Sequence, residues 1–239
     1  MNRRRDANRS QVRIVANPVA LPVDPQLILD ELNLPASEAG RVTRLITTAT
    51  ELAEAYTNRS FITRSVQLML DQFPVGDLPW WDGVRAGTIR AFAGDGIITL
   101  PKPPLIEVDS IEYFDLNNTL RVVDAGIYIV DALAEPGRVA LNLGATWPVD
   151  TRDRAAVLVT YKAGYGSTSA AVPAVVKDAI ISHVRDTIER PNTFVSAERV
   201  DNASINYGTP QSGASNKQGG LRGDAAAMLA NLRVLESGL

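Results

Sequence analysis

The sequence predicts an α+β fold: a helical bundle with an inserted antiparallel β module and an extended C-terminal tail ending in a helix. Three observations predict it. Apolar residues recur at three- and four-residue steps on both sides of the middle of the chain, as in amphipathic helices. The middle consists of short alternating runs separated by tight turns. A Gly- and Ser-rich linker, 208–223, then sets a last amphipathic segment apart.

Residues 24–60 are predicted to form two helices. Asp24 is the expected N-cap and Pro25 the first residue of the shorter helix, because a carboxylate satisfies free N–H groups and proline has none to lose. Ser37 is the expected N-cap of the longer helix, over 37–57. The apolar stripe of that helix comprises Val42, Leu45, Ile46, Ala49, Leu52, Ala53 and Tyr56.

Residues 61–163 predict one antiparallel β module, folded as a sandwich or a small barrel. The first strand begins near Phe61 and is followed by a loop that contains PWWDGVRAG. The later strand candidates are 87–93, 96–100, 106–114, 119–123, 126–130, 138–143 and 155–162. Most connections between them are too short for parallel crossovers, which need about a dozen residues or more. The strands should therefore pair antiparallel.

Three prolines, Pro101, Pro103 and Pro104, stand directly before the strand expected at 106–114. Proline fixes φ, favours extended backbone in the residue before it and removes a backbone donor. These residues should orient the start of the strand and block unwanted pairing at that edge. We interpret the stretch as part of the frame rather than of a site.

Residues 164–191 predict a helix that starts at Pro173 and packs on the N-terminal helices. Its apolar face comprises Val176, Ala179, Ile180, His183, Val184 and Thr187. Residues 192–239 predict an extended arm, the linker and a final helix over 225–236, capped by Asp224. A short helix is marginal alone in water, so its apolar face should either fold back on its own domain or dock on a neighbour.

The composition excludes several chemistries. The chain has no cysteine and one histidine, which excludes disulfides, thiolate nucleophiles and metal sites that need two imidazoles. No apolar run approaches the roughly 20 residues that span a bilayer, and the N-terminus lacks the apolar stretch of a secretory signal, so no membrane partner is expected. We expect synthesis in the cytoplasm.

The N-terminal arm, residues 1–23, is basic. Its first 13 residues carry five arginines and one aspartate, a net charge of +4, so the rest of the chain carries −7 of the total of −3. We expect the arm to be disordered in the free protein and to order on a partner, with Arg3, Arg4 and Arg5 as possible contacts. Binding of DNA phosphates by this arm is one alternative function.

Acidic residues near two adjacent tryptophans, Trp80 and Trp81, suggest a second alternative, a carbohydrate-active hydrolase. Glycoside hydrolysis needs two carboxylates at a set separation, and tryptophan stacks on sugars. The candidate carboxylates are Asp71, Asp77, Asp82 and Asp95. Acidic residues are also common in turns, and paired loop tryptophans serve packing or protein contact, which we favour.

No catalytic constellation emerges from the remaining residues. His183 has Asp186 three residues on, but no cysteine or nucleophile-elbow serine accompanies it, so a core or interface histidine is the better interpretation. The Gly residues of GDG (94–96) and AGYG (163–166) do not form a phosphate cradle. We therefore expect no enzyme activity, no catalytic residue, no cofactor and no metal.

Seven segments carry a resemblance to a known family. They are EAYTNRSFITRSVQLMLDQFP (54–74), PWWDGVRAG (79–87), ITLPKPPLIEVDSIEYFD (98–115), YIVD (128–131), TWP (146–148), VTYKAGYG (159–166) and VPAVVKDAIISHV (172–184). In this order and spacing, across 25–190, the chain resembles the head–tail connector, or adaptor, family of long-tailed bacteriophages and gene transfer agents. The basic arm and the long C-terminal tail depart from the usual pattern.

The resemblance implies a structural subunit of a virion, located in the neck between capsid and tail. It implies a homo-oligomeric ring of twelve copies that docks under the portal protein, receives a stopper or tail protein, and leaves a channel through which double-stranded DNA passes. It also implies that the C-terminal segment clasps the portal. The corresponding residues here are Leu221, Arg222, Met228, Leu229, Leu232, Arg233 and Leu235. Trp80 and Trp81 would form a second, loop interface.

Overall fold

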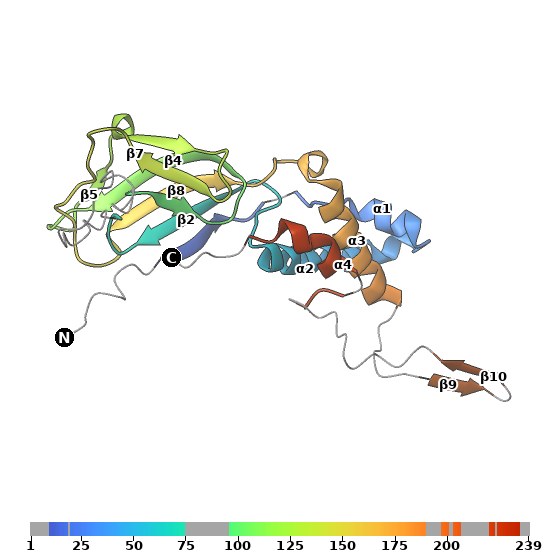
Figure 1. Cartoon of the computed structure of the whole chain (residues 1–239). Helices are drawn as coiled ribbons and strands as arrows, with labels where there is room; N and C mark the ends of the chain where they lie inside the picture. Colours follow the sequence, from blue (N-terminus) through green and yellow to red (C-terminus); the bar gives the residue numbers. More distant parts are fainter. Residues whose placement is uncertain are drawn as a thin grey trace, which may run out of the picture. The chain divides into compact units, whose positions relative to one another are not determined.

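The computed structural model describes residues 10–18, 20–74, 96–189, 197–200, 203–206, 220–222 and 224–234 (Figure 1). The chain divides into two compact units. The β unit comprises Met1–Pro18, Thr63–Tyr165 and Val234–Leu239, and the helical unit comprises Val19–Ile62 and Gly166–Arg233. The predicted α+β class is confirmed: the larger antiparallel sheets belong to the β unit, and the helices, with a small antiparallel hairpin, belong to the helical unit.

A five-stranded sheet forms one layer of the β unit, and all its neighbouring strands are antiparallel. Its order is β1 (Gln11–Ala16), β2 (Arg64–Leu70), β8 (Val157–Ala163), β4 (Leu105–Phe114) and β5 (Leu120–Val122). The central strand β8 is the last of the five in sequence. It is inserted between two earlier strands, an order that neighbour-to-neighbour pairing does not predict.

A three-stranded sheet forms the second layer, in the order β3 (Ile98–Leu100), β7 (Gly137–Leu141) and β6 (Tyr128–Asp131). A short 3-10 turn, Ala125–Ile127, precedes β6. Both sheets contribute to one core, in which Leu68 and Val159 of the larger sheet are buried together with Val139 of the smaller. The sheets thus form a sandwich, and neither closes into a barrel within the described residues.

The proline stretch connects the two layers. The hydroxyl of Tyr161 in β8 donates a hydrogen bond to the carbonyl of Pro101 at 2.7 Å, and the N–H of Gly164 donates to the carbonyl of Pro104 at 2.9 Å. Pro103 is buried. These contacts place the start of β4 against β8, so the stretch has the frame role expected from its prolines.

The helical unit contains α1 (Pro25–Glu31), α2 (Ala39–Thr57), α3 (Ala174–Glu189) and α4 (Ala225–Leu229). Helix α2 contacts the other three, and α3 also packs on α4 (Figure 1). Three 3-10 turns, Ala36–Glu38, Ser169–Ala171 and Ala230–Leu232, belong to the same unit. The apolar stripes of α2 and α3 supply buried residues to the contacts between the helices.

The start of α1 agrees with the sequence and the start of α2 does not. The Asp24 carboxylate accepts a hydrogen bond from the N–H of Gln26 at 2.9 Å, with Pro25 at the first helical position. Ser37 is not the N-cap of α2, because residues 36–38 form a 3-10 turn and Glu38 occupies that position without a side-chain cap bond. The α-helix therefore begins two residues later than predicted.

Two further differences concern the ends of the chain. Residues 11–16 form β1, paired with β2, where the sequence analysis expected disorder in the free protein. The segment expected to be an extended arm contains an antiparallel hairpin of β9 (Ala197–Val200) and β10 (Ala203–Asn206). The strand expected at 87–93 and nearly all of the linker at 208–223 lie outside the described residues.

Candidate assembly surfaces

The C-terminal segment folds back on its own helical unit. Leu221 and Leu229 are fully buried there, and Ala225 and Ala226 are buried beside them. Helix α4 packs on α2 and α3, and the carbonyl of Leu232 accepts a hydrogen bond from Nε of Arg59 at 2.7 Å. Of the two alternatives for the final helix, burial against the same domain is the one observed.

The final helix is also shorter than predicted. The α-helix ends at Leu229 and a 3-10 turn ends at Leu232, so the prediction of a helix to residue 236 is wrong. The expected cap is wrong as well, because the Asp224 side chain makes no capping hydrogen bond. The predicted portal residues now differ in accessibility: Met228 and Arg233 are exposed, and Leu235 lies outside the described part of the chain.

His183 fixes the start of this segment. Its Nδ1 accepts a hydrogen bond from the backbone N–H of Arg222 at 2.9 Å, across 39 residues of sequence. Burial of the ring lowers the pKa of His183 below its ordinary value, and the nearby Arg222 charge lowers the pKa further, while Asp186 opposes both effects. The ring is therefore neutral and structural, which agrees with its interpretation as a core histidine.

A cation–π contact and an ion pair also connect elements of the helical unit. The guanidinium of Arg233 lies over the ring of Tyr56, with 5.6 Å to the centroid. Arg185 of α3 forms an ion pair with Glu31 of α1. The segment from 220 to 233 is thus held within the helical unit by two hydrogen bonds, buried leucines and a cation–π contact.

The predicted contact residues Arg3, Arg4, Arg5, Trp80 and Trp81 lie outside the described part of the chain, as do the candidate carboxylates Asp77, Asp82 and Asp95. Asp71 is described, and its carboxylate accepts a hydrogen bond from the N–H of Ala155 at 3.0 Å. That contact fixes the loop before β8. Within the described ranges, no three acidic, histidine or cysteine residues gather as metal ligands, and no helix has the length and apolarity to cross a membrane.

The five-stranded sheet has two exposed edges, β1 and β5, and the strand at the first was not predicted from the sequence. Every residue of β1 and of β5 is exposed. In β1, Val12 and Ile14 stand opposite Leu68 and Val66, which point into the core, yet their own surfaces remain 41% and 43% exposed. The apolar, core-facing side of the sheet therefore extends onto β1, where it is no longer buried.

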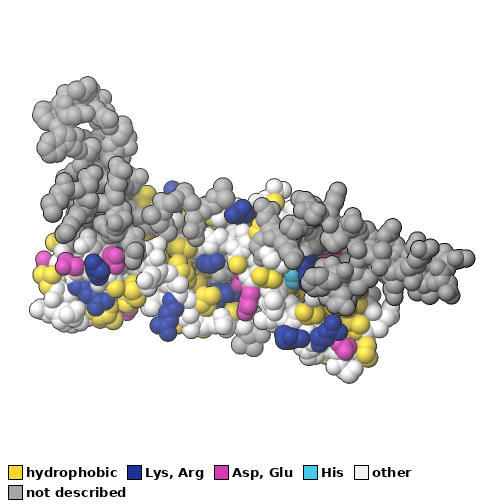
Figure 2. Space-filling view, turned by 90° about the horizontal axis from the view of Figure 1, so that it is seen from below, with side chains coloured by type: hydrophobic (Ala, Val, Ile, Leu, Met, Phe, Trp, Pro, Cys, Tyr) yellow, Lys and Arg dark blue, Asp and Glu magenta, His cyan; other side chains and the backbone are white. Residues whose placement is uncertain are grey.

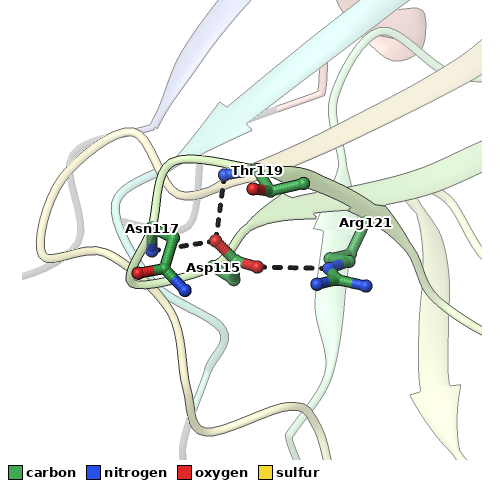
Figure 3. A network of polar contacts seen from close by, with 4 residues as sticks. All are labelled: Asp115, Asn117, Thr119 and Arg121. Atoms are coloured by element: carbon green, nitrogen blue, oxygen red, sulfur yellow. Dashed lines mark hydrogen bonds and ion pairs between the residues drawn. The ribbon is translucent and has the colours of Figure 1, made fainter.

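A turn around Asp115 fixes the position of β5, the strand at the other edge of the sheet. Asp115, at the end of β4, accepts hydrogen bonds from the N–H groups of Asn117 and Thr119, both at 2.9 Å, and pairs with Nε of Arg121 in β5 at 3.1 Å (Figure 3). These contacts lower the pKa of Asp115, the Thr119 N–H having the largest effect. The edge strand presents Val122, which is 70% exposed.

The face of this sheet that points away from the core carries charged side chains. Lys162 of β8 lies 2.5 Å from Glu107 and 3.4 Å from Asp109 of β4. Arg13 of β1 and Glu112 of β4 have no ion-pair partner within the described residues. On the side of the molecule that Figure 2 shows, basic, acidic and hydrophobic side chains are interspersed among the coloured residues.

The comparisons with known proteins identify the fold. No protein-family model and no curated protein sequence matches the chain. Among solved structures, a chain from the neck of an empty gene transfer agent particle, computed with C6 symmetry, superposes with a TM-score of 0.62 and 18% identity, covering 95% of this chain and 96% of that one. At this level of identity the likeness shows the shared fold.

Two further structures agree. A chain from the virion of a native gene transfer agent particle gives a TM-score of 0.61 at 18% identity, over 94% of this chain and 96% of that one. A chain from the neck of a native particle, computed with C12 symmetry, gives 0.59 at 18% identity, over 95% and 96%. The fold of this protein is thus that of chains found in gene transfer agent particles, two of them from the neck.

Proposed function

We propose that the chain is a structural subunit of the neck of a phage-like particle, and that it forms the adaptor ring between the portal and the tail. The observation that carries the proposal is the likeness to a neck chain over nearly the full length of both proteins, with 95% and 96% coverage. Seven sequence segments that resemble adaptor proteins support it independently. Its location would be the virion neck, after synthesis in the host cytoplasm.

The proposed partners follow from this position. Twelve copies would form the ring, a number supported by the C12 symmetry with which one neck of similar chains was computed. The portal protein would lie above the ring, a stopper or tail protein below it, and double-stranded DNA would pass through its channel. Outside the basic first 13 residues the chain carries a net charge of −7, which favours passage because an acidic wall does not hold the phosphates.

Portal contact would use the accessible side of the C-terminal segment. Met228 is 38% exposed and Arg233 is exposed, whereas Leu221 and Leu229 are buried in the helical unit. The two leucines would then act indirectly, by holding the segment in place, and Met228 and Arg233 would touch the portal. Arg3, Arg4 and Arg5 of the arm are a second proposed contact, as are Trp80 and Trp81 towards another neck component.

Imaging the neck of the complete particle by cryo-electron microscopy tests the proposal. We expect density for this chain as a ring directly below the portal, with matched symmetry. An intact neck that lacks this chain would overturn the proposal. A matched pair of variants then tests the portal contact: Met228→Asp should reduce the number of rings on portals, whereas Leu27→Asp, at an exposed position of α1, should not.

A further inference from the structure

The two edge strands of the five-stranded sheet, β1 and β5, are suited to contact between neighbouring copies of the chain. Natural proteins usually protect a free edge, because its unpaired backbone groups and apolar side chains recruit other strands. Here both edges are exposed and both carry apolar residues: Val12, Ile14 and Val15 on β1, Leu120 and Val122 on β5. Neither strand has a partner on its outer side within the described residues.

Strand direction restricts how copies can join at these edges. The sheet has five strands and every neighbouring pair is antiparallel, so β1 and β5 run in the same direction. Rotation about a ring axis that runs along the strands preserves this direction. The β5 edge of one copy would therefore lie parallel to the β1 edge of the next, and repetition of this unlike contact closes a ring. A two-fold axis would instead join two identical edges.

The charges at the two edges are complementary. Arg13 alternates with Val12 and Ile14, so it lies on the face away from the core, opposite Gln67. Glu112 pairs with Val122 of β5 and with Leu158 of β8, and it lies on the same face. Arg13, a cation without an ion-pair partner within the described residues, thus lies at the β1 edge, and Glu112, an anion that also lacks one there, lies next to the β5 edge. Such complementarity fixes the register of two edges that meet.

We propose that β1 of one subunit and β5 of the next lie side by side in the ring, with Arg13 of one copy near Glu112 of the other. The inference rests on the proposed function, which supplies the ring, and it assigns the surface that closes it. The neighbour would also cover Val12 and Ile14, which the chain's own second sheet leaves exposed.

Cysteine cross-linking tests the contact cleanly because the chain has no native cysteine. Gln11 and Val122 occupy one cross-strand row of the sheet, through Met69, Leu158 and Glu112. Chains with both Gln11→Cys and Val122→Cys, treated in assembled necks with a short bismaleimide, should form a ladder of multimers. Each single variant should remain monomeric, since unlike edges meet.

The outcomes separate this inference from the proposed function. Rings without a ladder for the double variant would overturn the edge contact and leave the neck assignment standing. Dimers from either single variant would overturn it too, because they require like edges to meet. A charge exchange gives a second test: Arg13→Glu and Glu112→Arg should each reduce ring assembly, and the combined variant should restore it. Failure to restore, with both variants folded, would also count against the contact.

Discussion

The backbone N–H of Arg222 donates a hydrogen bond to Nδ1 of His183, 2.9 Å away, and joins the C-terminal segment to α3. Only a neutral imidazole with an unprotonated Nδ1 accepts this bond. Protonation would remove the bond and place a positive charge in a buried site beside the Arg222 charge. The attachment of residues 220–234 is therefore linked to pH.

We predict that the pKa of His183 in the folded protein lies below its ordinary value of 6.5. A histidine whose pKa is lowered by folding contributes stability that is fully present above 6.5 and is lost as the pH falls from there through the folded pKa. Because it is the only histidine, its ring signals in an NMR titration need no assignment. Titration at 6.5 or above would contradict the prediction.

His183→Asn provides the matched variant. The asparagine oxygen takes a position close to that of Nδ1 and accepts the Arg222 N–H, but the side chain does not titrate. Amide exchange at Arg222, corrected for its intrinsic pH dependence, should rise below pH 6.5 in the natural chain and stay flat in the variant. Parallel behaviour of the two proteins would show that another group controls the segment.

The buried leucine of α4 should stabilise the helical unit. Leu229 is fully buried, so Leu229→Ala should lower the free energy of unfolding of that unit by about 2–5 kcal/mol through lost burial and a cavity. Met228, the adjacent residue, is 38% exposed, and Met228→Ala should cost about 1 kcal/mol or less. Urea unfolding followed by circular dichroism compares the two, and equal costs would mean that α4 does not pack as described.

Two glycine substitutions should change stability in opposite directions. A Cβ on Gly137 would lie 2.6 Å from both Cβ and Cδ2 of Leu105, so Gly137→Ala should destabilise the β unit by about 1–3 kcal/mol. A Cβ on Gly40 in α2 meets nothing within 4 Å, and Gly40→Ala should stabilise the helical unit by up to about 1 kcal/mol. Thermal unfolding of both variants checks the signs.

Local patterns predicted the strands well and their arrangement poorly. Alternation located β4 and β8 within one or two residues, because the two-residue period is a property of each strand alone. The insertion of β8 between β2 and β4 depends on contacts far apart in sequence. Strand β1 was missed because the arginines around Val12 and Ile14 suggested a solvated arm, although those residues alternate as in a strand.

The end of the final helix shows the same limit. Its apolar stripe continues to Leu235, which predicted a helix to residue 236. In the structure Arg59 donates to the carbonyl of Leu232, and this side chain satisfies an acceptor at the helix end. Nothing in the local pattern identifies a partner 173 residues away. The proposed pairing of Arg13 with Glu112 across two copies could not be inferred from the sequence either, since it depends on the order of the strands.

The Asp115 turn should control the position of the β5 edge. The carboxylate binds the N–H groups of Asn117 and Thr119 and the guanidinium of Arg121, so Asp115→Ala should increase amide exchange at Asn117 and Thr119 severalfold (Figure 3). Arg121→Ala removes only the ion pair and should change both amides less. An equal effect of the two variants would show that the ion pair, not the turn bonds, holds the strand.

The same carboxylate makes the turn sensitive to acid. Its pKa is lowered from the ordinary value of 3.8, chiefly by the Thr119 N–H, so its contribution to stability is present above 3.8 and is lost as the pH falls through the folded pKa. The Thr119 amide shift should therefore titrate with a midpoint below 3.8. If β5 forms the ring contact, Asp115→Ala in the Gln11→Cys, Val122→Cys chain should also weaken the cross-linked ladder. An unchanged ladder would mean that the edge contact does not depend on this turn.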